Sequence, residues 1–68
     1  MEKVVLAIGG MSCQGCVRNI TGLLQALPGV AAVEVSLEAG QARISYDAQL
    51  SSIAQFTHVI ENAGFDVL

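Results

Sequence analysis

The sequence predicts an α+β fold in which one four-stranded antiparallel sheet carries two helices on a single face. Three observations predict it. Segments at 3–8, 33–37 and 42–46 alternate apolar and polar residues, as half-buried strands do. Two longer segments repeat apolar residues at helical spacing. The 68 residues suffice for one domain at most, so all of these elements must share one core.

The first half of the chain is predicted to form a strand, a loop and a helix. Residues 3–8 place Val4, Leu6 and Ile8 on one face, and two glycines at 9 and 10 end the strand. A loop over 9–13 leads into a helix over 14–27, which a Pro-Gly pair at 28–29 terminates. The apolar stripe of this helix consists of Val17, Ile20, Leu24 and Leu27.

The second half is predicted to form two strands, a second helix and a short last strand. A hairpin turn at 38–41 joins the strands over 33–37 and 42–46, and residues 65–68 form the last strand. Ser52 and Gln55 fit a capping box at the start of the helix, and Gly64 is expected to be left-handed at its end. The expected core residues here are Tyr46 and the helix stripe of Ile53, Phe56, Ile60 and Ala63. The order β-α-β-β-α-β is typical of a ferredoxin-like sandwich.

Composition excludes several classes of function. The net charge is −3 and the three basic residues are scattered, so a nucleic-acid-binding surface is not expected. No apolar run is long enough to cross a bilayer, and no secretion signal is recognisable, so we expect no membrane insertion and a cytoplasmic location. Neither a catalytic triad, nor a paired-carboxylate site, nor a phosphate-binding loop is recognisable, and we therefore expect no enzyme activity.

The chemistry is concentrated in a C-x-x-C pair formed by Cys13 and Cys16. In a reducing compartment, such a pair is more often metal-binding or redox-active than a structural disulfide. Cys13 is expected on a loop and Cys16 in the first turn of the following helix, whose N-terminus favours thiolates. Gly9, Gly10 and Gly15 leave room for the loop to adjust and for a partner to approach closely.

The number of available ligands narrows the choice of metal. Thiolates are soft ligands that select copper(I), zinc or iron–sulfur clusters. A structural zinc site needs four protein ligands, whereas this chain offers two cysteines and a distant His58. One copper(I) ion per chain, held by Cys13 and Cys16, is therefore the expected cargo.

The motif and its surroundings resemble the heavy-metal-associated domain family over nearly the whole chain. The Gly-Met-Ser-Cys-Gln-Gly-Cys segment carries the resemblance most strongly. Further matching segments are 27–30, 33–38, 42–47 and 60–65. The resemblance implies one such domain over residues 1–68, with a ferredoxin-like fold and copper(I) bound by both cysteines.

The resemblance also implies that copper passes to a copper-transporting P-type ATPase or to another domain of the same family. Such a carrier is expected to be a monomer or a dimer bridged by copper. The chain begins at Met1 and ends just after the last predicted strand, as a free copper chaperone would. Phe65 is instead similar to the amino-terminal domains of the ATPases, which form the alternative; mercury and zinc relatives also exist.

Several residues allow two interpretations. The cysteine pair itself could serve a small thiol–disulfide redox protein. Met11 is interpreted as a core anchor of the loop and not as a ligand, and His58 as a solvated helix residue. Arg18 either is solvated or offsets the charge of the dithiolate site. Phe65 either packs in the core or shields the metal.

Overall fold

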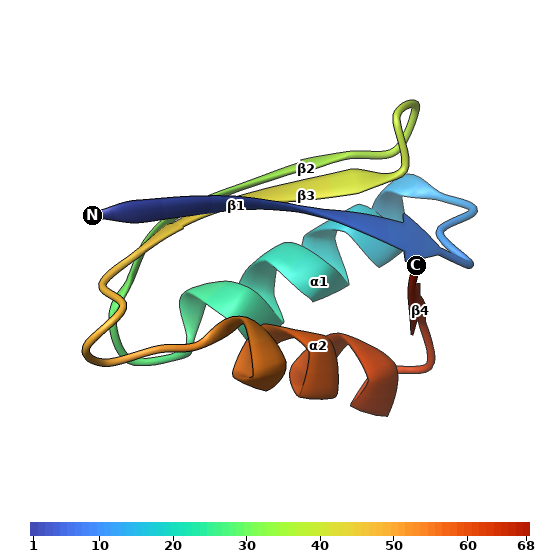
Figure 1. Cartoon of the computed structure of the whole chain (residues 1–68). Helices are drawn as coiled ribbons and strands as arrows, with labels where there is room; N and C mark the ends of the chain where they lie inside the picture. The colour runs from blue at the N-terminus through green and yellow to red at the C-terminus, as the bar shows by residue number, and fades with distance from the viewer.

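The computed structural model describes residues 1–68, and its elements follow the predicted order (Figure 1). The elements are β1 (Glu2–Gly9), α1 (Gln14–Gln25), β2 (Val30–Ser36), β3 (Gln41–Tyr46), α2 (Ile53–Asn62) and β4 (Asp66–Val67). The strands form one sheet in the order β2-β3-β1-β4, and every pair in it is antiparallel. Both helices cover the same face (Figure 1), so the ferredoxin-like sandwich is confirmed.

The core lies between the sheet and the two helices, and its residues come from the predicted alternations. Five large side chains are essentially inaccessible to solvent: Ile20, Leu24, Ile44, Phe56 and Ile60. Tyr46 on β3 meets Phe56 on α2 edge to face, with ring centroids 4.9 Å apart and an angle of 84° between the ring planes. The assignment of both aromatic residues to the core is therefore confirmed.

The expected caps of α2 are found at both ends. The hydroxyl of Ser52 accepts a hydrogen bond from the backbone N–H of Gln55 at 3.3 Å, which is one half of the predicted capping box. At the other end Gly64 has a φ of +96°, the left-handed conformation expected there. These local signals fix where α2 begins and ends.

Two boundaries differ from the prediction by two residues or more. Helix α1 ends at Gln25 and not at Leu27, because the N–H of Leu27 bonds to the carbonyl of Leu24 in a tighter final turn. Strand β2 begins at Val30 and not at Val33, because a bulge between Val30 and Ala32 lets pairing with β3 continue past the point where alternation stops. A bulge breaks the two-residue period, which hides the start of the strand.

One predicted core residue is wrong. Ile53 belongs to the helical stripe of α2, yet its side chain is 46% exposed, whereas Ile60 on the same helix is 1% exposed. Ile53 is the first residue of α2, so the stripe extends beyond the part of the helix that the core covers. Periodicity identifies the face of a helix but not how far along it the neighbouring layer extends.

We expect Ile60→Val to lower the free energy of unfolding by about 1 kcal/mol, because the lost methylene leaves a small cavity in a closed core. The same change at Ile53 should stay within about 0.5 kcal/mol, because that residue is already 46% exposed to solvent. Urea unfolding followed by circular dichroism measures both values on one helix. Equal losses at the two positions would contradict the burial described above.

Candidate metal centre

Cys13 and Cys16 lie where β1 is connected to α1. Strand β1 ends at Gly9, a short loop follows, and Cys13 is the N-cap residue of α1. Its extended backbone (φ −156°, ψ 166°) lets its carbonyl accept the N–H of Cys16 at 3.1 Å and that of Val17 at 3.4 Å. The Cys13 side chain makes no capping bond to the helix backbone. The first turn of α1 thus brings the two cysteines together and leaves the sulfur of Cys13 available.

The two sulfurs face each other as free thiols. Cys13 Sγ and Cys16 Sγ are 3.3 Å apart, within hydrogen-bonding distance, and no disulfide joins them. Cys13 is exposed and Cys16 is half-buried, as expected for one residue on the loop and one on the helix. No cluster of three or more His, Cys, Asp or Glu side chains occurs in the chain. The chain therefore presents a pair of adjacent thiols at its surface.

The surroundings of Cys16 favour its charged form. A hydrogen bond from the backbone of Ser12 is the largest cause that lowers the pKa of the Cys16 thiol, and a hydrogen bond from the side chain of Cys13 is the second. Desolvation raises this pKa but is outweighed by the hydrogen bonds. Because the thiolate is the form that binds metals, these bonds make Cys16 better suited to metal binding than an ordinary thiol.

Two hydrophobic side chains hold the loop in place. Met11 and Phe65 are half-buried and pack against the core. A Cβ atom placed on Gly10, which has a φ of +92°, would lie 3.7 Å from Cδ1 of Phe65. Met11 thus packs as expected for a loop anchor. Phe65 packs in the core and also lies against the loop, a proximity that the sequence left undecided.

The remaining candidate residues lie at the surface. His58 on α2 is exposed, and its Nε2 is 3.1 Å from Nδ2 of Asn62 one helical turn later. Arg18 on α1 is exposed and forms no ion pair. Both observations agree with solvated helix residues.

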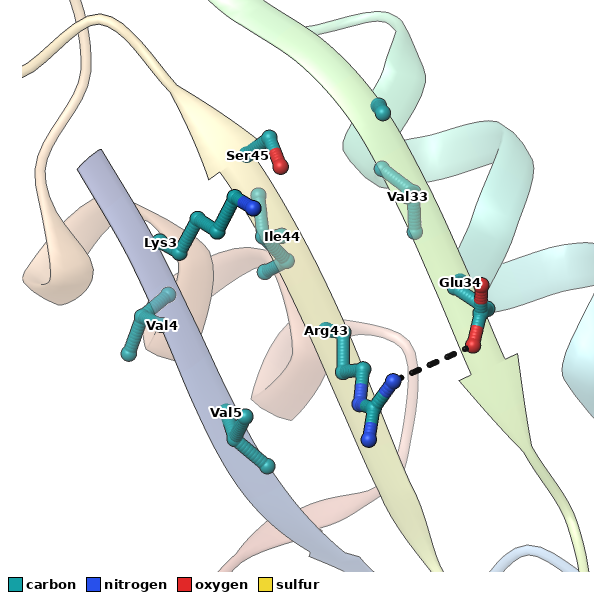
Figure 2. Close-up of a pocket in the computed structure, with 9 residues that line it drawn as sticks. Lys3, Val4, Val5, Val33, Glu34, Arg43, Ile44 and Ser45 are labelled. Atoms are coloured by element: carbon teal, nitrogen blue, oxygen red, sulfur yellow. Dashed lines mark ion pairs between the residues drawn. The ribbon is translucent and has the colours of Figure 1, made fainter. Parts of the chain in front are cut away.

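The largest hollow of the molecule is not the cysteine site. A groove of about 420 Å³ lies on the sheet face opposite the helices, over β1, β3 and β2 (Figure 2). Arg43 and Glu34 form an ion pair across it, with Nη1 and Oε1 3.6 Å apart, and both side chains are largely exposed. An exposed pair of this kind contributes little free energy, and the groove contains neither cysteine. The cysteine pair is therefore a surface site with no enclosing cavity.

Neither helix of the structure has the length and apolar character needed to cross a membrane. This finding agrees with the absence of a long apolar run in the sequence.

Comparison with known proteins places these features in a family. The model of the heavy-metal-associated domain matches residues 5–66. The chain is 43% identical over 67 residues to the copper chaperone CopZ of Bacillus subtilis, a match that covers 98% of this chain and 97% of that protein. It is 39% identical over 67 residues to copper-transporting ATPase 1 of Rattus norvegicus, where the match covers 98% of this chain but 4% of that protein.

A solved structure of a CopZ metallochaperone has the same fold. It superimposes with a TM-score of 0.96 at 33% identity and covers 98% of this chain and 100% of that one. Heavy-metal-associated domains bind metals without catalysing reactions, which agrees with the expectation of no enzyme activity and speaks against a redox enzyme. Because the family model spans most of the sequence and the fold agrees throughout, the chain belongs to the heavy-metal-associated domain family.

Proposed function

We propose that residues 1–68 form one cytoplasmic heavy-metal-associated domain that carries a single copper(I) ion on Cys13 and Cys16. The domain would pass the ion to a copper-transporting P-type ATPase or to another domain of the family. The observation that carries this proposal is the pair of surface sulfurs 3.3 Å apart at the start of α1. The similarity to the Bacillus subtilis copper chaperone supports copper as the cargo.

The ligand chemistry favours copper(I) among the metals that bind thiolates. Two sulfurs suit a soft ion that accepts a low coordination number, whereas a structural zinc site needs four protein ligands. The lowered pKa of Cys16 reduces the competition between protons and the metal for that sulfur. Two thiolates and one copper(I) ion leave a net charge of −1, which the partial positive charge at the N-terminus of α1 stabilises.

The unequal exposure of the two sulfurs supports a mechanism of transfer by ligand exchange. An incoming thiolate first forms a bond to the ion while both cysteines still hold it, and this gives a three-sulfur intermediate. The bond to one cysteine of this chain then breaks, followed by the second, as the acceptor supplies its own pair. Copper remains copper(I) throughout, so no electron donor or acceptor is needed. The exposed Cys13 is the sulfur beside which the new ligand enters.

A second candidate role is that of an amino-terminal metal-binding domain of a copper-transporting ATPase. The match to the rat ATPase, which spans nearly all of this chain, supports it. Both roles use the same two sulfurs and the same chemistry. The two roles are distinguished by the acceptor of the copper. A chaperone passes the ion to a domain of a separate ATPase, whereas an amino-terminal domain passes it to another part of its own polypeptide.

We expect one copper(I) ion per chain with sulfur as its only ligand type. X-ray absorption of the loaded protein should show sulfur scattering alone, and the double variant Cys13→Ser/Cys16→Ser should lose binding. Met11→Leu is the matched control, because leucine keeps similar bulk at an anchor that packs against the core, and affinity should fall by no more than about tenfold. Nitrogen donors in the spectrum, or equal losses in Met11→Leu and Cys13→Ser, would contradict the proposed ligand set.

The stability of the metal-free, reduced protein should depend on pH through Cys16. Folding lowers the pKa of the Cys16 thiol, so ionisation of this thiol stabilises the folded state. This contribution is fully present above the pKa that the thiol has in the unfolded chain. It is lost as the pH falls through the pKa that the thiol has in the folded chain. The stability advantage of the wild type over Cys16→Ser should therefore grow with rising pH and then level off. Urea unfolding of both proteins between about pH 6 and pH 10 tests this, because that interval brackets the pKa of an ordinary cysteine thiol. A difference that shrinks with rising pH would have the wrong sign.

Copper should pass directly to a partner domain without release of the free ion. The measurement mixes loaded protein, a metal-free partner that carries the same motif, and a chelator that traps free copper(I). We expect the partner to acquire copper first, through a transient interface of less than about 1,200 Å². A partner whose two cysteines are replaced by serine is the control and should leave all the copper to the chelator. If the chelator wins against the intact partner as well, the domain acts as a buffer and not as a carrier.

A further inference from the structure

Helix α1 contains two glycines, and neither is required by the backbone. Gly15 and Gly22 both lie within the helix, and neither has the left-handed conformation found at Gly10 or Gly64. Glycine weakens a helix compared with alanine, so its presence in the first turn has a cost with no local conformational reason.

The space around Gly15 gives it a role that Gly22 lacks. A Cβ atom at position 15 would lie 3.6 Å from Sγ of Cys13, in ordinary van der Waals contact, and this sulfur is its only new neighbour within 4 Å. A Cβ atom at position 22 would meet nothing within 4 Å. A Cβ atom at position 15 would therefore fit without strain, and the group that it would partly cover is the exposed sulfur of the proposed metal site.

We infer that Gly15 determines which thiolates reach the site, because its missing side chain leaves one flank of the Cys13 sulfur open. Cys16 Sγ, 3.3 Å away, occupies another flank. An incoming sulfur must approach an ion held between these two sulfurs, so bulk beside Cys13 obstructs its entry. The obstruction grows with the size of the molecule that carries the incoming thiol, and this makes Gly15 a specificity-determining residue for acceptors with protein-borne thiols.

The consequence for copper transfer rests on the proposed function, but the access to Cys13 does not. The access of alkylating reagents to Cys13 is measured on the metal-free chain in a Cys16→Ser background, so that Cys13 is the only thiol. The variants are Gly15→Ala and Gly15→Leu, with Gly22→Ala and Gly22→Leu as matched controls that change helix propensity in the same way. Rates of alkylation by iodoacetamide and by a bulky polymer-linked maleimide are taken at one fixed pH, and the ratio of the two rates cancels any difference in thiol reactivity between the variants.

We expect Gly15→Leu to slow the reaction of Cys13 with the bulky maleimide by about tenfold and its reaction with iodoacetamide by less. The rates of Gly15→Ala should be intermediate, and those of both Gly22 variants should equal the rates of the unsubstituted chain. In a second measurement, with both cysteines present, removal of bound copper(I) by a dithiol should slow in the same order while the equilibrium affinity stays constant. Alkylation rates that do not differ between the Gly15 and Gly22 series would overturn the inference, whatever the protein does with copper. Slower alkylation with unchanged copper removal would show that the incoming thiolate does not enter on this flank, which also overturns it.

If none of the proteins binds copper(I), the proposed function fails while the alkylation series still decides the access to Cys13. Circular dichroism of each variant verifies that α1 remains folded. Since an added Cβ meets only a surface sulfur at position 15 and nothing at position 22, and both positions are exposed, all four variants should fold.

Discussion

The attachment of α1 to the sheet is the constraint on which the proposed metal site depends. Ile20 and Leu24 are completely buried between the sheet and α2, so the position and direction of α1 follow from the core. The first turn of the helix then lies beside the end of β1, and the carbonyl of Cys13 closes that turn by accepting the N–H of Cys16. The backbone positions of the two cysteines are thereby set by protein packing before any metal binds. A preformed pair needs little ordering on binding, which favours affinity.

The two cysteines differ in the structural elements that carry them. Cys16 lies on the helix and is half-buried, whereas Cys13 is the N-cap residue at the end of a loop that contains a left-handed Gly10. Phe65, from the segment before β4, packs against the core and lies close to this loop at Gly10. One sulfur thus belongs to a helical residue and the other to the residue that caps the helix at the end of a loop. This asymmetry suits a site in which a ligand must be exchanged without losing the other.

Most of the fold could be predicted because its determinants are local. Alternation located the strands, and a serine cap and a left-handed Gly64 located the ends of α2. The errors arose where the outcome depends on tertiary structure. The bulge after Val30 interrupts the period of β2, and the exposure of Ile53 depends on how far the core extends along α2. Neither property has a signal within its own segment.

Some features of the candidate site could likewise be predicted from local sequence, and others could not. The spacing of Cys13 and Cys16 is a local feature and was sufficient to predict that the two sulfurs meet, which the structure bears out with a separation of 3.3 Å. Their assignment as the copper ligands remains a proposal. The hydrogen bond from the backbone of Ser12 to Cys16 and the contact of Phe65 with the loop depend on backbone positions and on strand pairing, which sequence spacing does not give.

A carrier must satisfy two opposing requirements, and the described features address them separately. Tight binding requires thiolates, and the hydrogen bonds around Cys16 favour that form without adding a further ligand. Rapid transfer requires that another sulfur can reach the ion before the first two release it, so the transition state must be accessible from outside. A buried site with four ligands would meet the first requirement and fail the second. On the proposed function, two sulfurs at a helix N-terminus, one of them exposed beside a residue without a side chain, would meet both, because affinity would come from the ligand type and rate from the open space around the exposed sulfur.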